Sequence, residues 1–87
     1  MVVQLTTEDK IDAEFNRLVY QRTRNITNKL EEQNFGRGSQ EVWLQWVDIM
    51  KEVNNQKAKG IPPIERRFYL VQEYFKRINP YEKRTLH

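Results

Sequence analysis

Cysteine is absent from the 87-residue sequence, and histidine occurs once, as His87 at the C-terminal end. The lack of cysteine excludes disulfide bonds and cysteine-based zinc sites, and it favours a reducing, cytoplasmic location. Because the sequence has no internal histidine, no serine or threonine has the usual base that would activate it as a nucleophile. We therefore expect no enzymatic activity, no metal site and no cofactor.

Glycine and proline are also scarce, with three of each, and the glycines do not have the spacing of a phosphate-binding loop. The apolar runs extend over only a few residues, so we expect neither a membrane-spanning helix nor a secretory signal segment. The scarce residues instead mark the chain at three places: Gly36–Ser39, Gly60–Pro63 and Asn79–Pro80. Apolar residues between these marks recur with the helical period, which predicts an all-α fold.

The pattern predicts three helices at about residues 7–34, 40–59 and 63–78, in one domain, 1–87, with a flexible tail at 80–87. Ser39 is expected to cap the second helix, and Pro63 suits the first position of the third. The apolar arcs of the second and third helices are wide enough to contact two neighbours each, which favours an antiparallel three-helix bundle. The expected core stripe of the third helix comprises Ile64, Phe68, Val71, Phe75 and Ile78, with Leu70 and Tyr74 beside it.

The expected helix lengths are unequal, because the first helix would be about 40 Å long and the third only about 24 Å. The first helix either extends past its neighbours or bends near Asn25–Asn28, where polar side chains compete for backbone hydrogen bonds. If it extends past them, three apolar side chains near its end lie uncovered and are candidates for partner binding: Ile26, Leu30 and Phe35.

Two further groups of residues are candidates for binding. Arg17, Tyr20 and Arg24 follow the i, i+3, i+7 spacing of one helix face, and tyrosine and arginine are enriched at the energetic centres of interfaces. A secondary basic face on the third helix contains Arg66, Tyr69 and Arg77. Glu73 lies four residues before Arg77, so an ordinary ion pair within the helix is the competing interpretation.

The net charge is +3, and all of the excess lies in the last 26 residues, which hold six bases and three acids. This excess is smaller than the basic surface of a dedicated nucleic-acid-binding domain. Our first hypothesis is therefore a small regulatory protein that binds and modulates a larger protein through its first helix. The small size and the lack of cysteine are typical of phage- or plasmid-encoded regulators. The alternatives are a nucleic-acid-binding protein that uses Arg17, Tyr20, Arg24 and the basic C-terminal segment, and a homo-oligomeric structural subunit.

Overall fold

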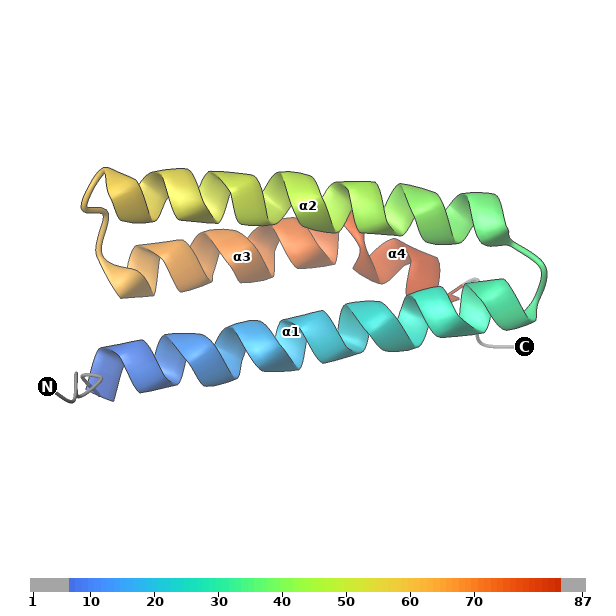
Figure 1. Cartoon of the computed structure of the whole chain (residues 1–87), viewed down its shortest axis with the longest axis horizontal. Coiled ribbons are helices and arrows are strands. Elements are labelled where there is room, and N and C mark those ends of the chain that lie inside the picture. The colour runs from blue at the N-terminus through green and yellow to red at the C-terminus, as the bar shows by residue number, and fades with distance from the viewer. Residues whose placement is uncertain (1–6, 84–87) are drawn as a thin grey trace, which may run out of the picture.

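The computed structural model describes residues 7–83, which form an all-α bundle with an extent of 47 Å along its longest axis. Its helices are α1 (Thr7–Glu32), α2 (Gly36–Ala58), α3 (Pro63–Arg77) and the short α4 (Asn79–Glu82). Figure 1 shows α2 running back along α1 and α3 running back along α2. The antiparallel three-helix bundle is thus confirmed. The end of the expected tail, residues 84–87, lies outside the described residues.

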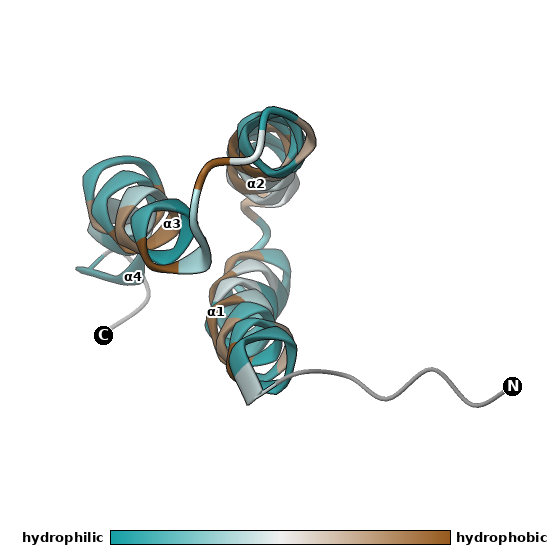
Figure 2. Cartoon of the chain, turned by 90° about the vertical axis from the view of Figure 1, so that its left-hand side faces the viewer, coloured by the Kyte–Doolittle hydropathy of each residue, from teal (hydrophilic) through white to brown (hydrophobic). Residues whose placement is uncertain are grey.

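The hydrophobic core lies along the axis between the three long helices, which Figure 2 shows at the corners of a triangle. Each helix contributes branched or aromatic side chains at helical spacing, and burying them supplies most of the free energy that stabilises the fold. The buried members are Val19, Ile26 and Leu30 of α1, Val42, Ile49 and Val53 of α2, Leu70 and Tyr74 of α3, and Ile78, which directly follows α3.

Helix α1 is continuous through Asn25–Asn28, so the bend that the sequence left open does not occur. Its buried threonines form hydrogen bonds that the helix accommodates: the Thr23 hydroxyl donates to the Val19 carbonyl and the Thr27 hydroxyl to the Arg24 carbonyl, both at 2.9 Å. Because these bonds go back to carbonyls within one turn, the side chains satisfy their polar groups without breaking the helix.

The turn between α1 and α2 is shorter than the sequence predicts. The Phe35 N–H donates to the Leu30 carbonyl at 2.7 Å and the Asn34 N–H to the Glu31 carbonyl at 3.0 Å, with Asn34 at a φ of 65°. This is the Schellman arrangement with asparagine at the left-handed position. Helix α2 therefore begins at Gly36, and the expected start at residue 40 with Ser39 as its cap is wrong.

Ser39 instead lies buried inside the first turns of α2, where its hydroxyl donates to Glu31 Oε1 at 3.0 Å. Glu31 thus joins the end of α1 to the start of α2. Gly38 packs beside Leu30, and a Cβ atom there would lie 3.8 Å from Leu30 Cδ1, which is an ordinary van der Waals contact.

The turn between α2 and α3 agrees with the sequence prediction. Gly60 has a φ of 79° and its N–H donates to the Lys57 carbonyl at 3.1 Å. The Ile61 N–H donates to the Gln56 carbonyl at 3.0 Å, which completes a second Schellman motif. Pro63 then occupies the first turn of α3, where its missing N–H would have no helical partner.

The expected overhang of the first helix is absent. With 26 residues α1 is about 39 Å long, and α2 with 23 residues is about 35 Å long. The chain breaks at Ile78 and continues as α4, whose Tyr81 hydroxyl donates to Glu41 Oε2 of α2 at 2.9 Å. Residues 80–82, which were expected to belong to a flexible tail, thus form part of α4 and continue the bundle beyond α3.

Candidate functional site

The candidate surface around Tyr20 lies along the seam between α1 and α2, and not on an isolated face of α1. The Tyr20 ring packs against Trp43 and Trp46 of α2, with ring centroids 5.7 and 5.8 Å apart. Arg17 forms an ion pair with Glu14, and this contact raises the pKa of the guanidinium and lowers that of the carboxyl. Arg24 is exposed, and its guanidinium forms no hydrogen bond or ion pair within residues 7–83.

The three side chains that were expected to lie uncovered at the end of α1 divide into two groups. Ile26 and Leu30 are only 3% and 1% exposed, because α2 reaches the end of α1 and α4 extends the third layer. They are core residues, and the expectation that they are open to a partner is wrong. Phe35, in the turn, is 57% exposed.

The two arginines of the secondary basic face on α3 are not free cations, because both are paired with carboxylates. Arg66 is buried and donates to Asp12 Oδ2 of α1 at 2.7 Å and to the Ile61 carbonyl at 3.1 Å. Arg77 donates to Asp48 Oδ2 at 2.6 Å, which raises its pKa, and it also pairs with Glu73 at 2.9 Å. The competing interpretation, an ion pair within the helix, is thus correct for Arg77.

Tyr69, the third member of that face, is half-buried beside these pairs. Burial and the nearby Glu73 raise the pKa of its hydroxyl. The arginines of this region therefore hold α3 against α1 and α2.

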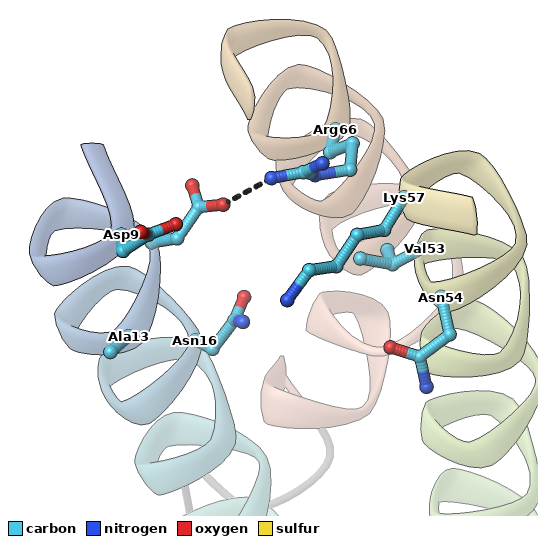
Figure 3. Close-up of a pocket in the computed structure, with 8 residues that line it drawn as sticks. Asp9, Ala13, Asn16, Val53, Asn54, Lys57 and Arg66 are labelled. Carbon is cyan, nitrogen blue, oxygen red and sulfur yellow. Dashed lines mark hydrogen bonds and ion pairs between the residues drawn. The ribbon is translucent and has the colours of Figure 1, made fainter. Parts of the chain in front are cut away.

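A polar pocket of about 380 Å³ opens between the three long helices at the end where α1 begins and α2 ends. Figure 3 shows Lys57 extending into it from α2 toward Asn16, with Asp9 and Arg66 at its rim. Residues 7–83 contain no group of three or more metal-ligating side chains placed to hold an ion. The Asp12 carboxylate in the wall accepts hydrogen bonds from Arg66 and Arg67, so it is committed to the structure.

The most unusual feature of the surface is the outer side of α3. Ile64, Phe68 and Phe75, which were expected in the core, are 68%, 74% and 52% exposed. The helix is rotated relative to this expectation, so that Leu70 and Tyr74 face inward with the charged side chains of Arg66 and Glu73. Since inward-facing Arg66 is paired with Asp12, its burial does not carry the cost of an isolated charge.

Helix α1 contributes a matching set of exposed apolar side chains in its first half. Ile11 and Leu18 are exposed and Phe15 between them is half-buried. Together with the aliphatic parts of Lys10 and Glu14 they line an open hollow of about 330 Å³.

Both sets lie where α1 and α3 adjoin, on the side of each helix that is turned away from α2. On α1, Ile11 and Leu18 lie about 20° and 40° around the helix axis from Arg22. The Arg22 guanidinium lies 5.9 Å from the centre of the Tyr74 ring of α3. On α3, the exposed stripe lies on the α1 side of the helix and away from α2. Figure 2 shows α1 and α3 at two corners of the triangle, with α2 at the third corner. We call this surface the α1/α3 apolar face: Ile11, Phe15, Leu18, Ile64, Phe68, Val71 and Phe75.

The size of this face sets it apart from ordinary exposed hydrophobic residues. At about 200 Å² for a large apolar side chain, the exposed fractions of its five most exposed members correspond to roughly 600 Å². The largest apolar patch on a typical monomeric protein is about 300–600 Å², and patches of that size commonly bind other proteins. The arrangement can therefore bury an apolar helix.

Sequence reasoning missed this face because it assigned the most regular apolar stripe of the third helix to the core. The available signal was the position of the charges: Arg66, Glu73 and Arg77 lie on the same side of α3 as Leu70. Helix α3 has two apolar sides, and one of them also carries arginines. Which side faces inward depends on whether other helices supply carboxylates for those arginines.

No family model matches the chain, and neither a curated protein nor a solved structure matches it. None of the helices in the described part of the chain has the length and apolarity of a membrane span. The function is therefore argued from the surfaces described above.

Proposed function

We propose that this protein is a non-catalytic protein-binding module that regulates larger proteins by docking on them through the α1/α3 apolar face. One observation carries the proposal: Ile64, Phe68 and Phe75 of the regular stripe are exposed, and Val71 between them is half-buried. Exposed apolar area costs about 25 cal/mol for each Å², and covering it with another chain recovers that free energy.

The form of the surface favours a helical ligand. An amphipathic helix presents apolar side chains at i, i+3, i+4 and i+7, and a groove between two helices accepts them side by side. The α1/α3 apolar face has apolar side chains on both helices, so a helix docked on it would complete a four-helix arrangement. This is a role for α1, but through Ile11 and Leu18 in its first half and not through its C-terminal end.

Nucleic-acid binding has less support. Arg66, Arg67 and Arg77 are committed to carboxylates of the same chain, so they are unavailable to phosphates. Arg24 beside the Tyr20 ring is the clearest free cation among the residues first considered.

Affinity capture with a matched pair of variants tests the proposal. Phe68→Glu places a charge in the middle of the α1/α3 apolar face, whereas Leu44→Glu places one on an equally exposed apolar residue of α2 outside it. We expect proteins captured from cells that express this protein to bind the wild type and Leu44→Glu, and to be lost with Phe68→Glu. Capture of the same proteins by all three, or of none, would contradict the proposal.

A further inference from the structure

We propose that, in the free protein, the occupant of the α1/α3 apolar face is a second copy of the same chain, with the two α3 helices packed antiparallel across a two-fold axis. This inference rests on the proposed function, because it names the chain that covers the face when no other protein does. Three properties of the described residues support it: the spacing of the stripe, the charges beside it and its area.

The stripe is symmetrical along the helix. Its members Ile64, Phe68, Val71 and Phe75 are separated by four, three and four residues, which reads the same in both directions. In an antiparallel pair, Ile64 of one copy lies opposite Phe75 of the other, and Phe68 lies opposite Val71. These pairs correspond to the layers of an antiparallel coiled coil, in which an a position of one helix packs against a d position of the other. A two-fold axis therefore pairs the stripe with itself without leaving any member uncovered.

The charges beside the stripe are complementary in the same orientation. Glu65 and Lys76 lie on the same side of the stripe, near its two ends, and both are exposed. Neither forms an ion pair within the described range 7–83. A two-fold axis that pairs Ile64 with Phe75 brings Glu65 to within about two residues, or roughly 3 Å along the axis, of Lys76 in the other copy. A parallel pair would place the two copies of Glu65, and those of Lys76, on opposite edges of the interface and would bring no Glu65 near a Lys76.

The apolar residues of α1 lie at the same height along the bundle axis as the α3 stripe, so they can contact the second copy. Asp12 contacts both Arg66 and Arg67, and Arg22 lies over Tyr74, so the segment from Ile11 to Leu18 runs beside the middle of α3. Each copy therefore presents α1 and α3 apolar side chains centred on one axis. The roughly 600 Å² estimated above for one copy approaches the area of about 800 Å² per partner in standard interfaces. Polar side chains around the face supply the remainder.

The Tyr20 surface stays outside such a dimer. Tyr20 packs on Trp43 and Trp46 of α2, whereas the α1/α3 apolar face includes no residue of α2. The two copies cover each other's apolar faces, so self-association and the binding of another protein at this face exclude each other.

Sedimentation velocity of the purified full chain over a concentration series tests the proposal. We expect a reversible monomer–dimer equilibrium whose dissociation constant rises roughly 30-fold or more in Phe68→Glu, as for loss of a central interface aromatic. Leu44→Glu should leave it unchanged. Far-UV circular dichroism of both variants checks that helix content is retained, which the exposure of both positions predicts.

Charge reversal tests the orientation. Glu65→Lys or Lys76→Glu alone places like charges opposite each other twice in the dimer, and each should weaken it about five-fold. The double variant Glu65→Lys/Lys76→Glu restores opposite charges and should return to within about two-fold of the wild type. Only a partner that carries both changes can restore the pairing, so recovery identifies a second copy.

Cysteine cross-linking gives an independent readout, because the sequence contains no cysteine. A disulfide requires Cα atoms within about 7 Å. Mixing Ile64→Cys with Phe75→Cys should yield a cross-linked dimer of the two variants under mild oxidation. Ile64→Cys alone should cross-link poorly, because the two copies of residue 64 lie about 16 Å apart along the axis.

A chain that stays monomeric up to millimolar concentration, or cross-links equally well at Leu44→Cys, overturns the dimer. Failure of the dimer is distinct from failure of the proposed function. If the monomer captures another protein and loses it with Phe68→Glu, the face is a docking site and only the identity of its occupant in the free protein is wrong.

Discussion

Arg66 and Asp12 are 54 residues apart in the sequence, yet their guanidinium and carboxylate groups meet at 2.7 Å between α3 and α1. Arg67 donates to the other oxygen of the same carboxylate, also at 2.7 Å. This carboxylate determines which side of α3 faces inward, since it holds two adjacent arginines that would otherwise lie against apolar surface.

Replacing Asp12 with alanine leaves the buried Arg66 without its carboxylate. We expect Asp12→Ala to lower the free energy of unfolding by about 2–3 kcal/mol, because removal of one partner strands a buried charge. Urea denaturation followed by circular dichroism measures this loss. Glu14→Ala is the control, since its ion pair with Arg17 is exposed, and its effect should be much smaller. Equal losses in the two variants would show that the contact with Arg66 is not specific.

The inward side of α3 can be tested with a second pair of substitutions. Leu70→Ala opens a cavity in the core and should cost about 3 kcal/mol, whereas Phe68→Ala removes an exposed ring and should cost less than about 1 kcal/mol. Both values come from urea denaturation at a low concentration, where any dimer has dissociated. The reverse order of losses would place the regular stripe in the core after all.

Tyr74 carries a buried hydroxyl for which residues 7–83 provide no hydrogen-bond partner. Replacing it with phenylalanine keeps the ring, which packs edge-on against Phe75, and removes the unsatisfied group. We expect Tyr74→Phe to raise the free energy of unfolding by up to about 1 kcal/mol at neutral pH. A loss of stability in the same urea experiment would show that the hydroxyl has a polar partner.

The same hydroxyl makes stability depend on alkaline pH. Burial raises the pKa of Tyr74 above its ordinary value of 10.0, so the folded chain holds this proton more tightly than the unfolded chain does. Its contribution is therefore fully present below pH 10 and is lost as the pH rises beyond it. Tyr74→Phe should lose less stability than the wild type between neutral pH and pH values above 10. Parallel losses would assign the alkaline transition to other groups, Tyr69 among them, whose pKa burial also raises.

The two ordered turns respond differently to an added methyl group. Gly60 has a φ of 79°, so Gly60→Ala forces a side chain into the left-handed region and should cost about 1 kcal/mol. Gly36 lies in the first turn of α2 with open space around it, and Gly36→Ala should be neutral or stabilise by a few tenths of a kcal/mol. Thermal unfolding compares the two, and a larger loss at Gly36 would mean that α2 begins later than Gly36.

The sequence was sufficient to predict the number of helices and the turn at Gly60, because periodicity and the left-handed glycine are local properties. It was insufficient at Ser39 and on α3. Ser39 has the chemistry of a cap, but the Schellman turn at Asn34 lets α2 begin at Gly36, and the Ser39 hydroxyl donates to Glu31 instead. On α3 the inward side depends on Asp12 and Asp48. These lie far away in the sequence, and no pattern within the helix reveals them.

Both tryptophans of the chain lie on α2 and contact Tyr20 of α1, so their fluorescence reports the docking of these two helices alone. Far-UV circular dichroism reports α3 as well. Comparing the two signals during denaturation therefore shows whether α3 detaches together with the α1–α2 hairpin or before it. Coincident curves indicate one cooperative unit. A helicity loss that precedes the fluorescence change indicates an independently opening third segment.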